Sequence, residues 1–300
     1  MQTGRAGLRR RMRITRRLIL LGGTAAGLAA CSRKPNAEKA APPARAALAP
    51  ASLEGVVAGA WRSEADRARD RFRHPVESLT FWGLKPGATV VEFWPGAGWY
   101  TDILAPYLEA TKGRFYAAVQ QDDQPASAQA VGVYRRKIEL NKRIYGEVNF
   151  TEFGPTSGPV APDGSADLVL FLRNVHNWMA AGLVEKAFAA AFAALKSGGV
   201  LGIEEHRAKA GGVPDPAASN GYVLEAYVKQ VAAEAGFRFD AASEITANPN
   251  DDTDHPFGVW TLPPTRRSSE PGKSPPADFD RAAYDAIGES DRMTLRFVKP

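Results

Sequence analysis

Four polar side chains directly follow an apolar run in the middle of the chain. Residues 168–172 read LVLFL, and the next five include Arg173, Asn174, His176 and Asn177. Histidine can accept a proton near neutral pH, and amide side chains can orient a substrate. Packing gives no reason for such a cluster at the end of a buried strand. We therefore predict a site with His176, Asn174 and Asn177 as catalytic candidates. The simpler alternative is that they are hydrogen-bonding residues at a strand end.

A glycine-containing loop follows an earlier strand-like run. Glu92 lies near the end of residues 89–93 and is followed by Trp94, Gly96 and Gly98. A turn from a strand into a helix places a ligand outside the carboxyl ends of the strands, and glycine lets the backbone approach it closely. A dinucleotide-binding loop would have a third glycine three residues after Gly98, where this chain has Thr101. The spacing therefore argues against NAD.

The strands that precede both groups must position them. Strand patterns alternate with helical patterns along the chain, which predicts a mainly parallel sheet with helices on both faces. We expect a doubly wound, Rossmann-like α/β fold with a strand at the C-terminus. The expected strands cover residues 89–93, 114–119, 148–153, 166–172, 200–206, 238–245 and 293–298. The expected helices cover residues 63–73, 76–82, 99–108, 128–145, 182–195 and 222–235.

The loop resembles the first motif of class I S-adenosylmethionine-dependent methyltransferases, an acid followed at two-residue steps by three glycines. Here the steps from Glu92 reach Trp94, Gly96 and Gly98, so tryptophan replaces the first glycine. S-adenosylmethionine has a sulfonium and an ammonium group but no pyrophosphate, which suits a carboxylate and aromatic faces. The resemblance implies this cofactor, with Glu92, Trp94, Gly96 and Gly98 among its binding residues.

The resemblance also assigns roles to other strand ends. In the family an acid after the second strand binds the ribose hydroxyls, and Gln120 or Asp122 stands near that position. The end of the fourth strand faces the methyl group and its acceptor, which implies that role for residues 173–177. Phrases such as RNVHNW at 173–178 and GVWTLPP at 258–264 resemble a group of exported predicted methyltransferases.

Two further polar residues, His206 and Arg207, end the next predicted strand. We expect them at the same edge of the sheet as His176. His176, Glu205 and His206 are an alternative set of metal ligands. The chain lacks a pair of histidines four residues apart of the kind that zinc proteases use, so no metal is predicted.

The first 31 residues resemble a lipoprotein signal. Seven arginines precede Leu18, and residues 18–30 form an apolar stretch too short to span a bilayer as a helix. Residues 28–31 read LAAC, which resembles a lipobox with Cys31, the only cysteine, as the lipidated residue. Residues 15–20, TRRLIL, resemble a twin-arginine export signal, although a merely basic leader is the alternative. These features predict a protein anchored in the cell envelope, on the periplasmic side, through a lipid on Cys31.

The rest of the chain divides into a tether and one domain. Residues 32–50 are rich in alanine and proline without apolar periodicity, so we expect a flexible tether there. The methyltransferase-like domain is expected over residues 51–300. Within it, residues 246–291 form a long connection rich in proline, aspartate and asparagine, which predicts a lid or flap over a site.

The net charge of +5 overstates how basic the folded part is. The seven arginines of the leader account for the excess, and the remaining 31 basic residues are outnumbered by 33 acidic ones. A surface with this balance lacks the large basic footprint that phosphate backbones require, so no nucleic-acid partner is expected.

Two functions remain open from the sequence. The first is methyl transfer from S-adenosylmethionine to an acceptor, of unknown identity, in the cell envelope. The second is a non-catalytic envelope module that keeps the methyltransferase fold to bind a ligand or partner. The expected location, where a supply of the cofactor is not anticipated, and the tryptophan at the first glycine position both favour the second.

Overall fold

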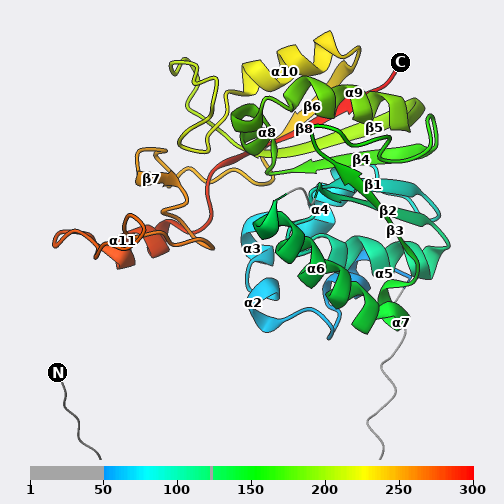
Figure 1. Cartoon of the computed structure of the whole chain (residues 1–300), viewed down its shortest axis with the longest axis horizontal. Helices are drawn as coiled ribbons and strands as arrows, with labels where there is room; N and C mark the ends of the chain where they lie inside the picture. Colours follow the sequence, from blue (N-terminus) through cyan, green and yellow to red (C-terminus); the bar gives the residue numbers. More distant parts are fainter. Residues whose placement is uncertain (1–50, 122–123) are drawn as a thin grey trace, which may run out of the picture. The chain divides into compact units, whose positions relative to one another are not determined.

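The computed structural model describes residues 51–121 and 124–300, which form a layered α/β structure (Figure 1). Its centre is a seven-stranded sheet in the order β3-β2-β1-β4-β5-β8-β6. The strands are β1 (Thr89–Phe93), β2 (Arg114–Gln120), β3 (Val148–Phe153), β4 (Ala166–Leu172), β5 (Leu195–His206), β6 (Arg238–Ser243) and β8 (Arg292–Val298). A further short strand, β7 (Pro256–Val259), lies outside this sheet.

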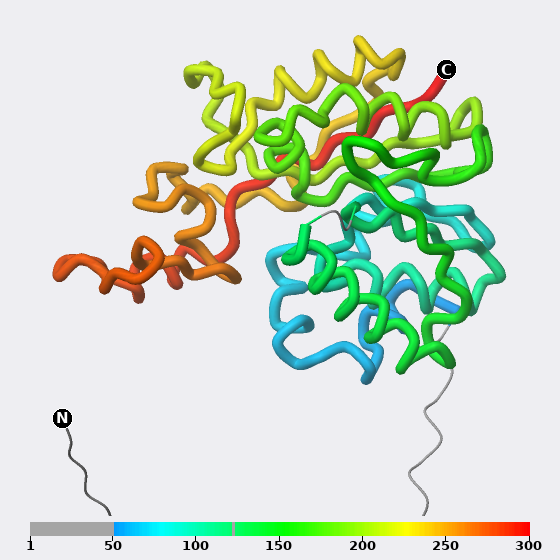
Figure 2. Tube along the Cα trace, in the orientation of Figure 1, coloured from blue at the N-terminus to red at the C-terminus, as the bar shows by residue number. Residues whose placement is uncertain are grey.

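The sheet confirms the predicted mainly parallel, doubly wound arrangement. β1 pairs in parallel with β2 and β4, and β2 with β3 and β4 with β5 do the same. The C-terminal strand β8, red in Figure 2, runs antiparallel between β5 and β6. The carboxyl ends of the parallel strands therefore lie at one edge of the sheet. The loops that follow β1, β2 and β4 and contain the predicted site residues begin there.

Helices cover both faces of the sheet (Figure 1). Buried residues at helical spacing, such as Val184, Ala187, Phe188 and Ala191 on α9, explain why these segments pack on the sheet. One face carries α8 (Val175–Ala181), α9 (Val184–Ala194) and α10 (Glu225–Glu234). The other carries α1 (Leu53–Val57), α4 (Pro75–Phe81), α5 (Thr101–Thr111), α6 (Pro125–Leu140) and α7 (Lys142–Tyr145).

The structure corrects two predicted helices and adds three. The helix expected over 63–73 is two single turns, α2 (Glu64–Arg67) and α3 (Asp70–Arg73), and the one expected over 128–145 divides into α6 and α7. The second break lies at Asn141, whose side chain donates to the carbonyl oxygen of Lys137 at 2.9 Å. Asparagine competes with helical hydrogen bonds in this way. The additions are α1, α11 (Arg281–Ile287) and α8, the last of which begins inside the polar cluster predicted to follow β4.

The predicted lid, residues 246–291, contains β7 and α11 (Arg281–Ile287) and lies at the left of Figure 1, on the side of α8. Cys31 and Asp122 lie outside the described residues. Among the helices that the structure describes, none is long and apolar enough to cross a membrane.

Candidate functional site

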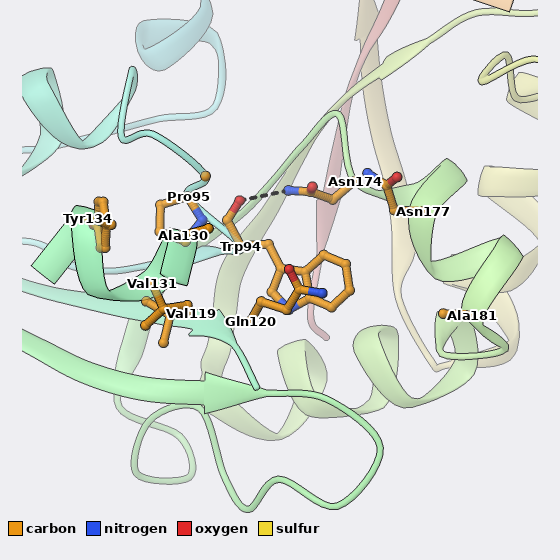
Figure 3. A pocket seen from close by; sticks show the side chains of 11 residues that line it. Trp94, Pro95, Val119, Gln120, Ala130, Val131, Tyr134, Asn174, Asn177 and Ala181 are labelled. Carbon is orange, nitrogen blue, oxygen red and sulfur yellow. Dashed lines mark hydrogen bonds between the residues drawn. The ribbon is translucent and has the colours of Figure 1, made fainter. Parts of the chain in front are cut away.

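A cavity of about 400 Å³ lies at the carboxyl ends of β1, β2 and β4 (Figure 3). The predicted residues Trp94, Gly96, Gln120, Asn174 and Asn177 line it. The other lining residues are Pro95, Val119, Ala130, Val131, Tyr134 and Ala181. The sheet thus brings the glycine loop, the end of β2 and part of the polar cluster to one site.

Trp94 has a left-handed backbone conformation, which glycine adopts far more readily than other residues. Its φ is +45°, in the left-handed region that costs a residue with a side chain about 1–2 kcal/mol. Three hydrogen bonds hold it there. Its amide donates to Ala118 O at 2.8 Å, its indole Nε1 donates to Phe153 O at 2.9 Å, and its own carbonyl accepts from Asn174 Nδ2 at 3.2 Å. These hydrogen bonds therefore offset the cost of a left-handed residue other than glycine at this point of the loop.

The two glycines of the loop have different surroundings. Gly96 has φ +58° and lines the cavity, and a Cβ built there would meet no atom within 4 Å. Gly98 has φ +82°, and a Cβ there would lie 2.9 Å from Cε2 of Tyr134. Gly96 therefore leaves open space beside the cavity, whereas Gly98 lets the aromatic ring of α6 pack against the loop.

Glu92 is buried beneath the loop and is absent from the cavity lining. Its Oε2 accepts a hydrogen bond from Thr101 Oγ1 at 2.8 Å, and Thr101 Oγ1 lies 3.0 Å from the Tyr134 hydroxyl, which belongs to a cavity residue. Burial raises the pKa of Glu92 to about 7, although the hydrogen bond from Thr101 opposes the shift. Glu92 therefore reaches the cavity through Thr101 and Tyr134.

Asn174 and His176, both predicted to be catalytic, line different cavities. Asn174 holds the loop after β1 and lines the first cavity with Asn177 (Figure 3). His176 lines a second cavity of about 180 Å³. The Arg173–Asn177 turn thus separates two sites. The other residues of the second cavity are Arg73, Arg173, His206, Val259, Trp260, Pro263, Pro264, Thr265, Glu289 and Ser290.

Glu205 positions His176 from the neighbouring strand. Its Oε1 lies 2.9 Å from His176 Nδ1, and its Oε2 accepts from the amides of Val175 at 2.6 Å and His176 at 3.4 Å. Because a carboxylate accepts hydrogen bonds and does not donate them, this pairing places the imidazole proton on Nδ1. The other ring nitrogen, Nε2, is then free to accept a proton.

The second cavity includes residues that sequence reasoning did not select. Arg73 ends α3, Glu289 and Ser290 precede β8, and Trp260 belongs to the predicted lid. The lid segment therefore borders the His176 cavity. The one signal in the sequence was the family-like phrase at 258–264, which contains Trp260, and such a phrase carries no spatial information.

His206 lies beside His176 as expected, with ring centroids 5.2 Å apart, whereas Arg207 pairs with Asp291 and Glu244. His176, Glu205 and His206 bring possible ligand atoms within 4.8 Å of one another, and so do Asp251, Asp252 and His255. In the first group, Glu205 already accepts three backbone amides and the His176 ring. In the second, Asp251 already accepts from Tyr222, His255, Thr253 and Asp291. These hydrogen bonds account for both arrangements without a metal.

The comparisons with known proteins show the fold. No protein-family model matches the chain, and no curated protein does. Among solved structures, the [4+2]-cyclase SpnF matches with a TM-score of 0.51 and 15% identity over 76% of this chain and 80% of its own. At that identity, the likeness shows a shared fold.

Two other solved structures have slightly lower scores. A SAM-dependent methyltransferase from Aquifex aeolicus has a TM-score of 0.48 and 22% identity over 59% of this chain and 86% of its own. Geranyl diphosphate C-methyltransferase from Streptomyces coelicolor A3(2), solved with S-adenosyl-L-homocysteine, has a TM-score of 0.49 and 13% sequence identity. The match covers 83% of this chain and 84% of that one.

Proposed function

We propose that this chain is an S-adenosylmethionine-dependent methyltransferase that binds its cofactor in the first cavity. One observation carries the proposal. Residues that the resemblance assigns to the cofactor, Trp94, Gly96 and Gln120, line one cavity at the strand ends together with Asn174 and Asn177. Ligands of doubly wound sheets bind at such a position.

The cavity suits the chemistry of this cofactor. Among its lining residues that the structure describes, none is charged, which fits a ligand without pyrophosphate. The rings of Trp94 and Tyr134 offer aromatic faces, and a cation over such a face gains about 0.5–2 kcal/mol. Gly96 lets the backbone approach the ligand. Of the two candidates for binding the ribose hydroxyls of the cofactor, Gln120 lies in the described part of the chain and lines the cavity.

When bound, S-adenosylmethionine supplies an activated methyl group on a sulfonium. The protein then has to orient the acceptor, an effect that can reach about 7–11 kcal/mol. Asn177 and Asn174 lie at the end of β4, where the resemblance places the acceptor. His176 lines the second cavity with Nδ1 bound to Glu205, so it is the candidate base for an acceptor that extends from the first cavity into the second, and a positioned base contributes about 10²–10⁴-fold.

The second candidate function is a non-catalytic module that binds a ligand in the same cavity. The tryptophan in the loop supports it, because Trp94 occupies space that a glycine would leave free. SpnF, which shares this fold, is a [4+2]-cyclase, so the fold also serves activities other than methyl transfer. Transfer and binding therefore need separate tests.

The proposed location is the periplasmic side of the cell envelope, with a lipid on Cys31 as the membrane anchor. The arginine-rich start, the short apolar stretch and the LAAC sequence support this. The acceptor is then an envelope component.

Methyl transfer is tested with S-adenosylmethionine labelled on its methyl group and a cell-envelope fraction as the source of acceptor. We expect label to appear in the fraction with the wild-type chain. His176→Ala is expected to lower the rate by no more than about 10⁴-fold and to keep cofactor affinity. Cofactor binding without any transfer favours the non-catalytic module.

A further inference from the structure

We propose that the second cavity binds the oxyanion group of a small ligand, either a carboxylate or a phosphate. Its walls carry Arg73, Arg173, His176, His206 and Ser290. This cavity is separate from the proposed cofactor cavity, and the methyltransferase resemblance implies no anionic ligand for it.

The arginines around the cavity outnumber their carboxylate partners. Arg69 and Arg73 both bond to Glu289, at 2.6 and 2.8 Å. Arg173 bonds to Glu204 at 2.6 Å. Arg292 bonds to Glu204 at 2.9 Å and to Glu289 at 3.1 Å. Arg69 also lies 3.9 Å from the carboxylate of Asp66, so four guanidinium groups face three carboxylates and one positive charge is left uncompensated within this cluster.

Arg73 carries part of this excess into the cavity. Its side chain is 4% exposed, and within residues 51–121 and 124–300 its one hydrogen bond runs from Nε to Glu289. The two Nη groups face no acceptor in that part of the chain although they belong to a cavity-lining residue. Neither Nη group is among the described buried atoms that lack a partner, so both open to the cavity, where they can donate to a ligand. Burial and then repulsion from Arg173 lower the pKa of Arg73 to about 9.

Aromatic rings hold the two arginines in place. The guanidinium of Arg73 lies 4.7 Å from the centre of the Trp99 ring, and that of Arg173 lies 5.7 Å from the Tyr100 ring. Such stacking leaves the edge of a guanidinium free to donate two parallel hydrogen bonds to one carboxylate or phosphate. The site is therefore preorganised for an oxyanion.

The remaining polar groups of the cavity do not oppose an anion. Glu289 lines it, but both of its oxygens already accept from arginines. His206 lies with Nδ1 2.5 Å from Ser290 Oγ, and burial, followed by repulsion from His176, lowers its pKa well below the usual range. Serine and neutral histidine are ordinary hydrogen-bonding partners for an oxyanion. The assignment of this anionic group to the methyl acceptor rests on the proposed function.

The test is calorimetric titration of the full-length chain with inorganic phosphate and, separately, with acetate, in a chloride buffer. We expect saturable binding of at least one anion. Phosphate alone indicates a phosphoryl group, and acetate alone indicates a carboxylate. If neither anion binds saturably to the wild-type chain up to about 100 mM, the inference is wrong.

Arg73→Gln is expected to weaken anion binding at least about tenfold, because it removes the unpartnered donors. Arg69→Gln is the matched control, since it removes the same charge and another Glu289 bond outside the cavity lining. It should change the affinity by less than about threefold. Equal losses in the two variants would overturn the assignment. If Arg73→Gln does not fold, Arg73→Lys keeps the charge but not the planar fork, and an unchanged affinity there would also count against the site.

S-adenosylhomocysteine is titrated into the same samples. Anion binding without S-adenosylhomocysteine binding leaves this inference intact and counts against the proposed function. The reverse result leaves the cofactor assignment intact and overturns the anion site.

Discussion

The side-chain amide of Asn174 lies 3.2 Å from the carbonyl oxygen of Trp94 and 3.1 Å from that of Phe93. Both bonds join the end of β4 to the loop that follows β1. An asparagine chosen from the sequence as a catalytic candidate therefore also holds the cofactor loop in its path, including the left-handed residue Trp94.

Replacing this asparagine tests the link between loop and cavity. Asn174→Ala leaves two carbonyl groups without that donor, so we expect the free energy of unfolding to fall by about 1–3 kcal/mol and the affinity for S-adenosylhomocysteine to fall about tenfold. Asn177→Ala is the control, because Asn177 lines the same cavity without a hydrogen bond to the loop. Urea unfolding and calorimetry measure both effects. Equal stability in the two variants would contradict the anchoring role.

Alanine substitutions at the two loop glycines should have different effects on stability. Gly96→Ala adds a methyl group in open space, so we expect a stability loss of only about 1–2 kcal/mol, from the left-handed backbone, with weaker cofactor binding. Gly98→Ala adds the same strain and also meets the Tyr134 ring, so it should destabilise the fold further. Thermal unfolding with and without S-adenosylhomocysteine separates the two. A larger stability loss for Gly96→Ala would argue against this geometry.

The buried carboxyl of Glu92 predicts a pH dependence of stability. Its pKa is raised to about 7 in the folded chain from 4.5, so the folded state binds the extra proton between these values. Stability therefore falls as pH rises through this window, by up to about 3 kcal/mol. Glu92→Gln stays neutral and should remove this part of the decline. The measurement is the free energy of urea unfolding between pH 5 and pH 8. If this free energy falls equally with pH in the variant and the wild type, Glu92 is not the cause of the decline.

Much of the fold could be predicted from the sequence, because buried strands appear in it as apolar runs. The predicted bounds of 89–93, 148–153 and 166–172 coincide with β1, β3 and β4. The start of α8 within the polar cluster was missed, since its first turn is fixed by Glu205 on another strand. Arg73 and Glu289 are 216 residues apart, and local patterns carry no information about such a contact. Sequence reasoning therefore placed His176 and His206 at one edge of the sheet but could not add Arg73 and Glu289 to the same cavity.

The leader prediction concerns Cys31, the only thiol in the chain. Cys31→Ser should abolish lipidation and leave the protein unprocessed or soluble, because no other residue can accept the lipid through a thioether. Mass spectrometry of the N-terminal peptide and membrane fractionation measure the change. Recovery of the same acylated, membrane-bound species from the variant would contradict the prediction.

The central claim is that the cavity bounded by Trp94, Gly96, Gln120, Asn174 and Asn177 binds S-adenosylmethionine. Calorimetric titration of the full-length chain with S-adenosylhomocysteine tests it most directly, with Gly96→Val as the variant that fills the open side of the loop. We predict a dissociation constant in about the micromolar range for the wild-type chain, the lower end of ordinary substrate affinities, and no measurable binding to Gly96→Val in samples that remain folded. An absence of binding to the wild-type chain up to about 1 mM, or equal affinity in the two proteins, would contradict the claim.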